Sequence, residues 1–239
     1  MESRPTTASP QDAAIVSGAC LAPWGERAAN LPGAADAELP PLSGFVVSRF
    51  SPLVAEVVRR CLAGHDVAGP ATAVVLGSVV ADATTADVAA RDLANGNVHN
   101  PLLFFQSVPS SILGALAKEY GITGPMTCLS AREDLPRHLL DSAALLLAEE
   151  PVERVLVIGV ELEPQPRARQ VFAELAAAGS AVRPPQGDVA VALLLARPVR
   201  LPAPDAGPPE FGYLAPLAAL CPAAEFTTSE CPTTVKGAI

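Results

Sequence analysis

Aromatic residues are scarce in this sequence, and their scarcity limits how its core can be built. Of 239 residues only 4% are aromatic, whereas 50% are hydrophobic and 17% are charged. The core must therefore consist mainly of Ala, Val and Leu, which suits close packing of helices on a sheet. A chain of this length and hydrophobic content forms a globular fold with a substantial core.

The sequence also lacks the patterns of metal sites, disulfide frameworks, signal peptides and membrane spans. Its five cysteines are widely spaced, with no C-x-x-C motif and no Cys/His cluster. The N-terminus is polar, without the apolar stretch of a signal peptide, and no apolar run approaches the roughly 20 residues that cross a bilayer. We therefore expect a cytoplasmic protein with reduced thiols, no metal, no cofactor and no membrane span. The cysteines are Cys20, Cys61, Cys128, Cys221 and Cys231.

Positive charge is in short supply. The 16 Lys and Arg residues stand against 25 Asp and Glu residues, which gives a net charge of −9. Nucleic acids and anionic membranes attract basic surfaces, so neither is expected as a partner. The acidic residues are spread along the chain without a long run, and they mainly indicate solubility.

Alternating strand and helix patterns run from residue 13 to residue 197, which we predict to be one domain. Residues 1–12 are expected to be a disordered tail, and residues 198–239, where prolines are dense and periodicity fades, an extended arm. The alternation predicts a layered α/β fold, a mixed sheet covered by helices on both faces. Ser51 and Pro52 are expected to start the first helix, as N-cap and first position. Strands are predicted at 13–19, 71–77, 126–129, 152–160 and 188–196, with helices between them that include 51–62, 84–94 and 167–178.

The stretch 100–150 carries the most information on function. A tight turn at 121–125 separates a helix from the short apolar strand 126–129. After the strand, Ser130-Ala-Arg-Glu133 has the spacing of a capping box, in which the Ser130 and Glu133 side chains satisfy free backbone donors at a helix start. A strand that leads directly into a capped helix is a common position for an enzyme nucleophile, because the helix N-terminus favours an anion.

This order of elements resembles the N-terminal half of a β-ketoacyl synthase, a condensing enzyme of the thiolase fold. The resemblance rests on Tyr120-Gly-Ile-Thr-Gly-Pro125 before a short strand and a helix, and on the later strand Arg154-Val-Leu-Val-Ile-Gly-Val-Glu161. The segment from Asn100-Pro101 to Ser110 resembles the dimer-interface region of the same family. The motifs cover residues 13–196 and imply a thiolase-like fold of which only the N-terminal half is present.

Two departures from the family pattern indicate a subunit without catalytic residues of its own. In the synthases the nucleophilic cysteine lies nine positions beyond the glycine of Gly-Pro, and counting from Gly124 leads to Glu133. A carboxylate cannot replace a thiolate in acyl transfer from a carrier protein, because the anhydride it forms is labile. The catalytic histidines of the family belong to its C-terminal half, whereas this chain has only His65, His99 and His138.

The resemblance therefore implies a chain length factor, the catalytically silent partner of a complete β-ketoacyl synthase in polyketide and aryl-polyene pathways. Such a subunit pairs with a full-length synthase, closes the acyl tunnel at the interface and meets the acyl carrier protein through the complex. Two alternatives stay open. One is a stand-alone malonyl-carrier decarboxylase, although synthase-like domains with that activity carry glutamine at this position and keep the histidines. The other is a carrier-binding scaffold, which is disfavoured because carrier proteins are acidic and would be repelled by a charge of −9.

Candidate site residues follow from this interpretation, and no metal ligand is among them. Glu133 either only caps the helix together with Ser130 or also touches the site of the partner. Cys128 is expected to be buried and inert, and His138 to have neither a metal partner nor a base role. The candidates for the interface and the tunnel wall come from one segment and are Leu103, Phe104, Phe105, Gln106, Val108 and Ser111.

Overall fold

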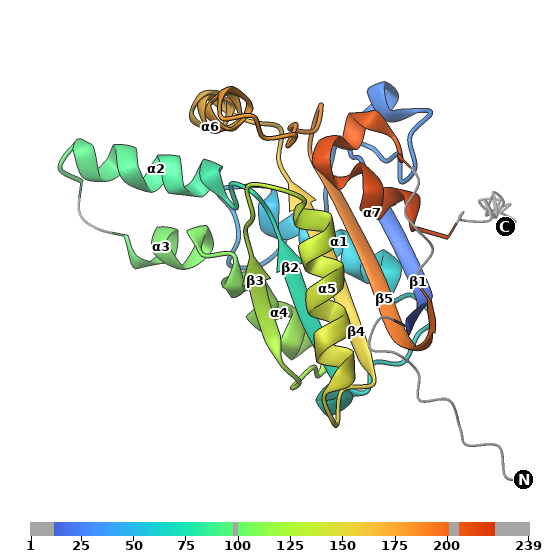
Figure 1. Cartoon of the computed structure of the whole chain (residues 1–239). Coiled ribbons are helices and arrows are strands. Elements are labelled where there is room, and N and C mark those ends of the chain that lie inside the picture. The colour runs from blue at the N-terminus through green and yellow to red at the C-terminus, as the bar shows by residue number, and fades with distance from the viewer. Residues whose placement is uncertain (1–11, 98–99, 201–205, 223–239) are drawn as a thin grey trace, which may run out of the picture.

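The computed structural model describes residues 12–97, 100–200 and 206–222, and its centre is a mixed five-stranded sheet (Figure 1). The strand order is β1-β5-β4-β2-β3. Strands β2, β3 and β4 are parallel, whereas β5 pairs antiparallel with both β1 and β4. The predicted α/β class with a mixed sheet is confirmed. The strands are β1 (Asp12–Leu21), β2 (Thr72–Gly77), β3 (Met126–Leu129), β4 (Arg154–Glu161) and β5 (Val189–Arg200).

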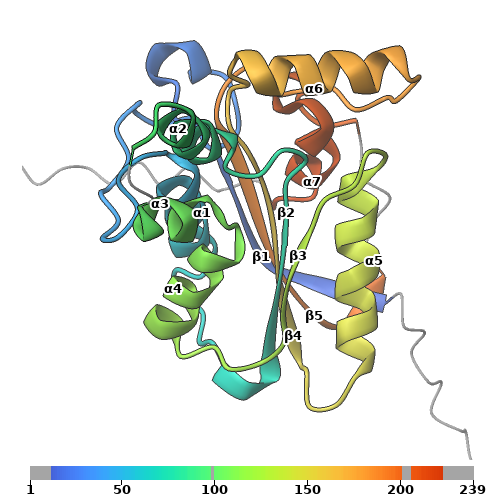
Figure 2. The same cartoon turned by 90° about the vertical axis from the view of Figure 1, so that its left-hand side faces the viewer.

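Helices cover both faces of the sheet, as predicted (Figure 2). α1 (Phe50–Cys61) and α4 (Ser110–Tyr120) pack on one face, and α5 (Leu135–Ala148) packs on the other. α2 (Ala83–Ala94) and α3 (Pro101–Ser107) contact each other and extend sideways beyond β3 (Figure 1). The remaining helical segments are α6 (Pro166–Ala177), α7 (Ala215–Ala219) and three 3₁₀ segments, η1 (Gly25–Ala28), η2 (Gly69–Ala71) and η3 (Pro209–Leu214).

The middle residues of the central strands are all apolar because each strand contributes side chains to two cores, one on each face of the sheet. On β4, Val155 and Val157 pack in the core that α5 covers, whereas Leu156 and Ile158 pack in the core that α1 and α4 cover. All four side chains are fully buried. Successive residues of a strand point to opposite faces, so a strand enclosed on both sides loses the polar alternation of an exposed one.

The turn before β3 depends on its glycines. Gly121 ends α4 in the left-handed region, with φ of 67°, which glycine adopts without steric cost. A Cβ atom on Gly124 would lie 2.2 Å from the carbonyl oxygen of Thr72. The chain thus passes too close to the start of β2 for any other residue. This approach sets β3 beside β2, with Leu129 level with Gly77.

The prediction of an extended arm from residue 198 is wrong for the residues that the structure describes. β5 continues to Arg200, and residues 206–222 return to the sheet as η3 and α7 (Figure 1). Phe211 and Leu214 are 0% exposed within the core that also receives α5. This segment is therefore part of the folded domain.

The dense prolines led to the prediction of an extended arm, but they lie at positions where a helix tolerates proline. Both η3 and α7 have a proline in their first two positions, where no intrahelical donor is needed. The remainder of the predicted arm, 201–205 and 223–239, and residues 1–11 of the predicted tail lie outside the described residues. Asp12 is the first residue of β1.

The start of α1 also differs from the prediction. The helix begins at Phe50, and the Phe50 backbone amide donates to the Ser48 hydroxyl at 3.0 Å. Ser51, predicted as the N-cap, lies inside the helix and is buried. Across the described ranges, no helix is long and apolar enough to cross a membrane.

Candidate functional site at the carboxyl ends of the parallel strands

The carboxyl ends of β2, β3 and β4 meet at one edge of the sheet, where open α/β folds place their ligand sites. Gly77, at the end of β2, is level with Leu129 on β3 and with Gly159 on β4. The loop 78–82, the loop 130–134 and the end of β4 at Glu161 are thereby brought together. This edge is where the sequence predicted the strand-to-helix site.

Glu161 is the buried centre of this edge. It ends β4 with 0% of its surface exposed. Its Oε2 atom accepts hydrogen bonds from the Tyr213 hydroxyl at 2.7 Å, from the Val79 amide at 2.9 Å and from the Ser78 hydroxyl at 3.2 Å. The carboxyl group thus joins β4, the loop after β2 and η3.

Burial determines the protonation of this carboxyl group. It raises the pKa of Glu161 to about 7, against the lowering effect of the hydrogen bonds from Tyr213, Val79, Val80 and Ser78. Its Oε1 atom has no hydrogen-bond partner among the described residues. Burial, and next the neighbouring carboxylate, raise the pKa of Tyr213 well above its ordinary value, so the phenol stays protonated and donates.

Neither Glu161 nor Tyr213 was a candidate from sequence. A carboxyl residue at the end of an apolar strand is the available signal, but the strand predicted at 152–160 stops one residue before Glu161. Tyr213 gave no signal, because it lies in the segment predicted to be an arm. Their contact spans 52 residues of sequence, which no local pattern reports.

The predicted capping box is wrong. α5 begins at Leu135, and its N-cap is Asp134, whose side chain accepts from the Arg137 amide at 3.4 Å. The Ser130 hydroxyl instead donates to the Val79 carbonyl at 3.0 Å and ties the loop after β3 to the loop after β2. Glu133 is exposed and caps nothing in the structure. The helix starts later because the chain first crosses from the end of β3 through a five-residue loop.

Backbone strain accompanies this late start. Asp134 has φ of 42°, and Ala81, in the facing loop after β2, has φ of 54°. They are the non-glycine residues with positive φ in the described ranges. Such conformations cost free energy and concentrate at functional sites, where the surrounding structure holds them. Both mark the same edge of the sheet.

A surface pocket of about 450 Å³ lies beside Glu133. Arg132, His138 and Ser180 also line it. The Ser180 hydroxyl donates to the Arg132 carbonyl at 2.7 Å, and His138 Nδ1 lies 2.9 Å from the Asp134 carbonyl. These contacts hold the polar atoms against the backbone of the loop. The groups of three or more His, Cys, Asp and Glu side chains that a metal ion requires do not occur in the described part of the chain.

Cys128 is predicted from the sequence to be buried and inert. It is half-buried on β3 and belongs to the wall of the core under α1 and α4. Burial raises its pKa, so at neutral pH it is a protonated thiol, the poorly nucleophilic form. Glu133, which the resemblance aligns with the nucleophile of the synthases, is five residues further along the chain, in the loop before α5.

In the segment 101–113 some side chains are buried and others are exposed to solvent. Leu103 and Gln106 are buried, whereas Phe104 is 64% and Phe105 46% exposed. The Gln106 side chain accepts from the backbone amides of Val46 at 3.0 Å and Val47 at 3.2 Å and so anchors that loop. Val108 and Ser111 are half-buried.

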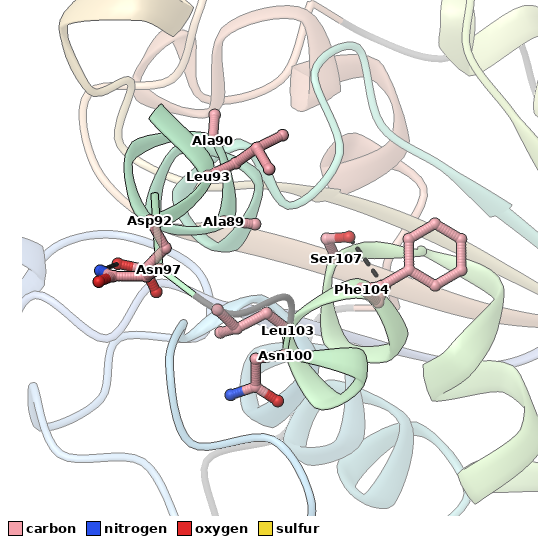
Figure 3. Close-up of a pocket in the computed structure, with 9 residues that line it drawn as sticks. All are labelled: Ala89, Ala90, Asp92, Leu93, Asn97, Asn100, Leu103, Phe104 and Ser107. Atoms are coloured by element: carbon pink, nitrogen blue, oxygen red, sulfur yellow. Dashed lines mark hydrogen bonds between the residues drawn. The ribbon is translucent and has the colours of Figure 1, made fainter. Parts of the chain in front are cut away.

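A small pocket separates α2 from α3 (Figure 3). Its volume is about 170 Å³. Apolar residues of both helices form much of it, and the exposed ring of Phe104 points away from α2. The lining residues are Ala89, Ala90, Asp92, Leu93, Asn97, Asn100, Leu103, Phe104 and Ser107.

This architecture is the thiolase-like fold of the ketosynthases. Among solved structures it is similar to the ketosynthase (ApeO) in complex with its chain length factor (ApeC) from Xenorhabdus doucetiae, with a TM-score of 0.58, 22% identity, and 79% of this chain and 80% of that chain covered. For the ishigamide ketosynthase/chain length factor the TM-score is 0.55 and the identity 20%, over 78% of this chain and 62% of that one.

A third similar structure is AntDE:AntF, a type II PKS acyl-carrier protein in complex with its ketosynthase. Its TM-score is 0.55 and its identity 16%, over 79% of this chain and 58% of that one. This chain therefore spans less than two thirds of the length of the second and third matches. At these identities the similarity establishes the fold, and the predicted resemblance to a ketosynthase and chain length factor is confirmed at that level. The sequence matches no protein-family model and no curated protein.

Proposed function

We propose that this chain is the chain-length-factor subunit of a two-subunit condensing enzyme. It pairs with a full-length β-ketoacyl synthase, which supplies the catalytic cysteine and histidines. Within the pair it shapes the acyl or polyene tunnel while a polyketide or fatty-acid-like chain grows on a carrier protein in the cytoplasm. One observation carries this proposal. An exposed carboxylate, Glu133, stands at the strand-to-helix position where a condensing enzyme needs a thiolate.

The open edge of the sheet supports a protein partner. Within the described residues β3 pairs with β2 alone, which leaves its other edge free. An unpaired strand edge is a template for pairing with another chain. β3 is only four residues long and its side chains are half-buried, so the strand alone makes a small contact and needs an apolar surface beside it.

Exposed apolar side chains supply that surface near the same side of the molecule. Leu93 on α2 is 70% exposed, and Leu102 on α3 is 47% exposed. Phe104 and Phe105, also on α3, are exposed as well, and we call these four side chains the apolar patch. They belong to the two helices that extend beyond β3 (Figure 1). Clustered exposed apolar side chains mark interaction sites. Each phenylalanine is a good anchor because aromatic side chains dominate interface energetics.

A substitution on α3 tests the pairing. Phe104→Asp puts a charge into the patch and is expected to raise the Kd for the partner at least about 30-fold, the effect of losing roughly 2 kcal/mol at an interface hot spot. The partner to use is a full-length β-ketoacyl synthase co-expressed with this chain, with complex formation followed by light scattering after size exclusion.

Leu145→Asp is the matched control, since Leu145 is 68% exposed on α5, on the opposite face of the sheet. It should leave pairing unchanged. The proposal fails if the two variants weaken pairing equally, or if the wild-type chain is a monodisperse monomer that ignores the synthase.

The pocket beside Glu133 favours examining one alternative, a malonyl-carrier decarboxylase acting alone. Glu133→Gln removes the charge at the position that the synthases give to their nucleophilic cysteine, which is the charge this alternative would use. We expect the isolated protein to release no carbon dioxide from malonyl-carrier above the uncatalysed rate. We also expect Glu133→Gln to change the rate of the two-subunit complex by less than about twofold, within the range of a surface substitution. Decarboxylation by the isolated chain that Glu133→Gln abolishes would support the alternative.

A further inference from the structure

Two cysteine thiols far apart in sequence lie in contact. Cys20 is near the end of β1, and Cys221 follows α7. Their Sγ atoms are 3.1 Å apart across 201 residues of sequence, and the Cys20 thiol donates toward Cys221. Both are free thiols in the structure. The Cys20 Sγ also points toward the Ala218 carbonyl at 3.9 Å.

The fold holds these thiols together from both sides. A Cβ atom on Gly18 would lie 2.8 Å from Cδ of Pro222 and 3.3 Å from Cα of Cys221. The segment after α7 therefore runs against β1 at a position where only glycine leaves room. On the other side, Leu217 of α7 is 1% exposed in the core. The contact is thus built into the packing of α7 on the sheet.

We propose that Cys20 and Cys221 form a reversible intramolecular disulfide when the protein meets a disulfide oxidant. The two sulfur atoms need to approach each other by only about 1 Å to reach the usual bond length of about 2.05 Å. With oxidised glutathione, two protein thiols and one glutathione disulfide give one protein disulfide and two molecules of reduced glutathione. The two electrons pass from the protein sulfurs to glutathione, which also takes up the two thiol protons.

The order of the two exchange steps follows from exposure. Cys221 is half-buried, whereas Cys20 is only 7% exposed. The Cys221 thiolate therefore attacks first and forms a mixed disulfide, and the Cys20 thiolate then attacks the Cys221 sulfur and expels glutathione. The adjacent Cys20 thiol and burial raise the pKa of Cys221, so the first step is slow at neutral pH and accelerates as the pH rises.

The cross-link has a structural consequence at the site. It ties β1 to the segment that carries Tyr213, the residue that donates to Glu161. Closing so long a loop restricts the unfolded chain strongly. Oxidation therefore locks the C-terminal turns onto the sheet and stabilises the buried hydrogen bonds around Glu161.

The test uses the full chain treated with oxidised glutathione, analysed by thiol counting and by peptide mapping with mass spectrometry. We expect the loss of two thiols, a Cys20–Cys221 linked peptide, a rise in Tm on the order of 10 °C, and reversal by dithiothreitol. Cys20→Ser and Cys221→Ser should each abolish all of these, while Cys128→Ser, which removes a thiol elsewhere on the sheet, should abolish none. An unchanged thiol count, glutathione retained on wild-type Cys221, or a Cys221–Cys231 linked peptide would overturn the proposal.

Discussion

Phe211→Ala is expected to lower the free energy of unfolding by about 3–5 kcal/mol, the usual cost of removing a buried phenylalanine ring. Phe211 is 0% exposed and belongs to the core that α5 and α7 share with the sheet. The loss should appear as a lower midpoint in urea denaturation with a similar slope, because the surface exposed on unfolding changes little.

Phe105→Ala is the control for this substitution. Phe105 is 46% exposed and contacts Phe45 with 5.6 Å between ring centroids, so its removal should cost clearly less. If Phe211→Ala destabilises the protein no more than Phe105→Ala does, residues 206–222 are not an integral part of the core. The comparison of the two variants therefore tests whether residues 206–222 belong to the folded core or to an extended arm.

The sequence predicts the layered fold well because its strands are long and apolar. β4 and β5 read as buried strands from composition alone, and the 121–125 turn shows through its glycines and proline. These features are local, or arise from burial on both faces of a sheet. Helix starts are less accurate, since serine can serve as a cap or as an ordinary helical residue, as Ser51 does here.

The candidate site could be predicted only in part. Counting from Gly124, on the spacing that the family resemblance implies, selected Glu133, and the structure places this residue in the loop that leads into α5. The hydrogen bonds of Glu161 could not be foreseen, because they join residues 52 and more positions apart. Tertiary contacts of this kind depend on how η3 packs back against the sheet. The proline-rich composition of this segment predicted an extended arm instead.

Two residues with strained backbones lie in the facing loops of this edge. The strained Asp134 lies directly after Glu133, and the strained Ala81 lies in the facing loop. The Ser130 hydroxyl joins the two loops through Val79. Strain of this kind needs support from surrounding contacts. For the loop of Ala81 that support includes the hydrogen bonds that Ser78, Val79 and Val80 donate to the buried Glu161. These contacts hold the two loops in fixed positions at this edge of the sheet.

The stability of the protein is expected to decrease as pH rises from about 4.5 to about 7 because of Glu161. Its pKa of about 7 in the folded protein exceeds the ordinary value of 4.5, so the folded state binds the proton more tightly than the unfolded state. The resulting stabilisation is complete below pH 4.5 and is lost between pH 4.5 and 7 as the folded carboxyl group ionises. The difference between the folded and unfolded pKa values of Glu161 corresponds to about 3 kcal/mol of unfolding free energy.

Glu161→Gln isolates this effect, because the amide oxygen can accept from the same donors and stays neutral at every pH. Relative to wild type, the variant should gain about 3 kcal/mol of unfolding free energy between pH 4.5 and pH 8.5, measured by urea denaturation at intervals across that range. Glu133→Gln, which neutralises an exposed carboxylate at the same edge, should show no such trend. A wild-type-to-variant difference that stays constant with pH would show that Glu161 is already ionised in the folded protein below pH 5. Its hydrogen bonds from Tyr213, Val79 and Ser78 would then outweigh the cost of burying the charge.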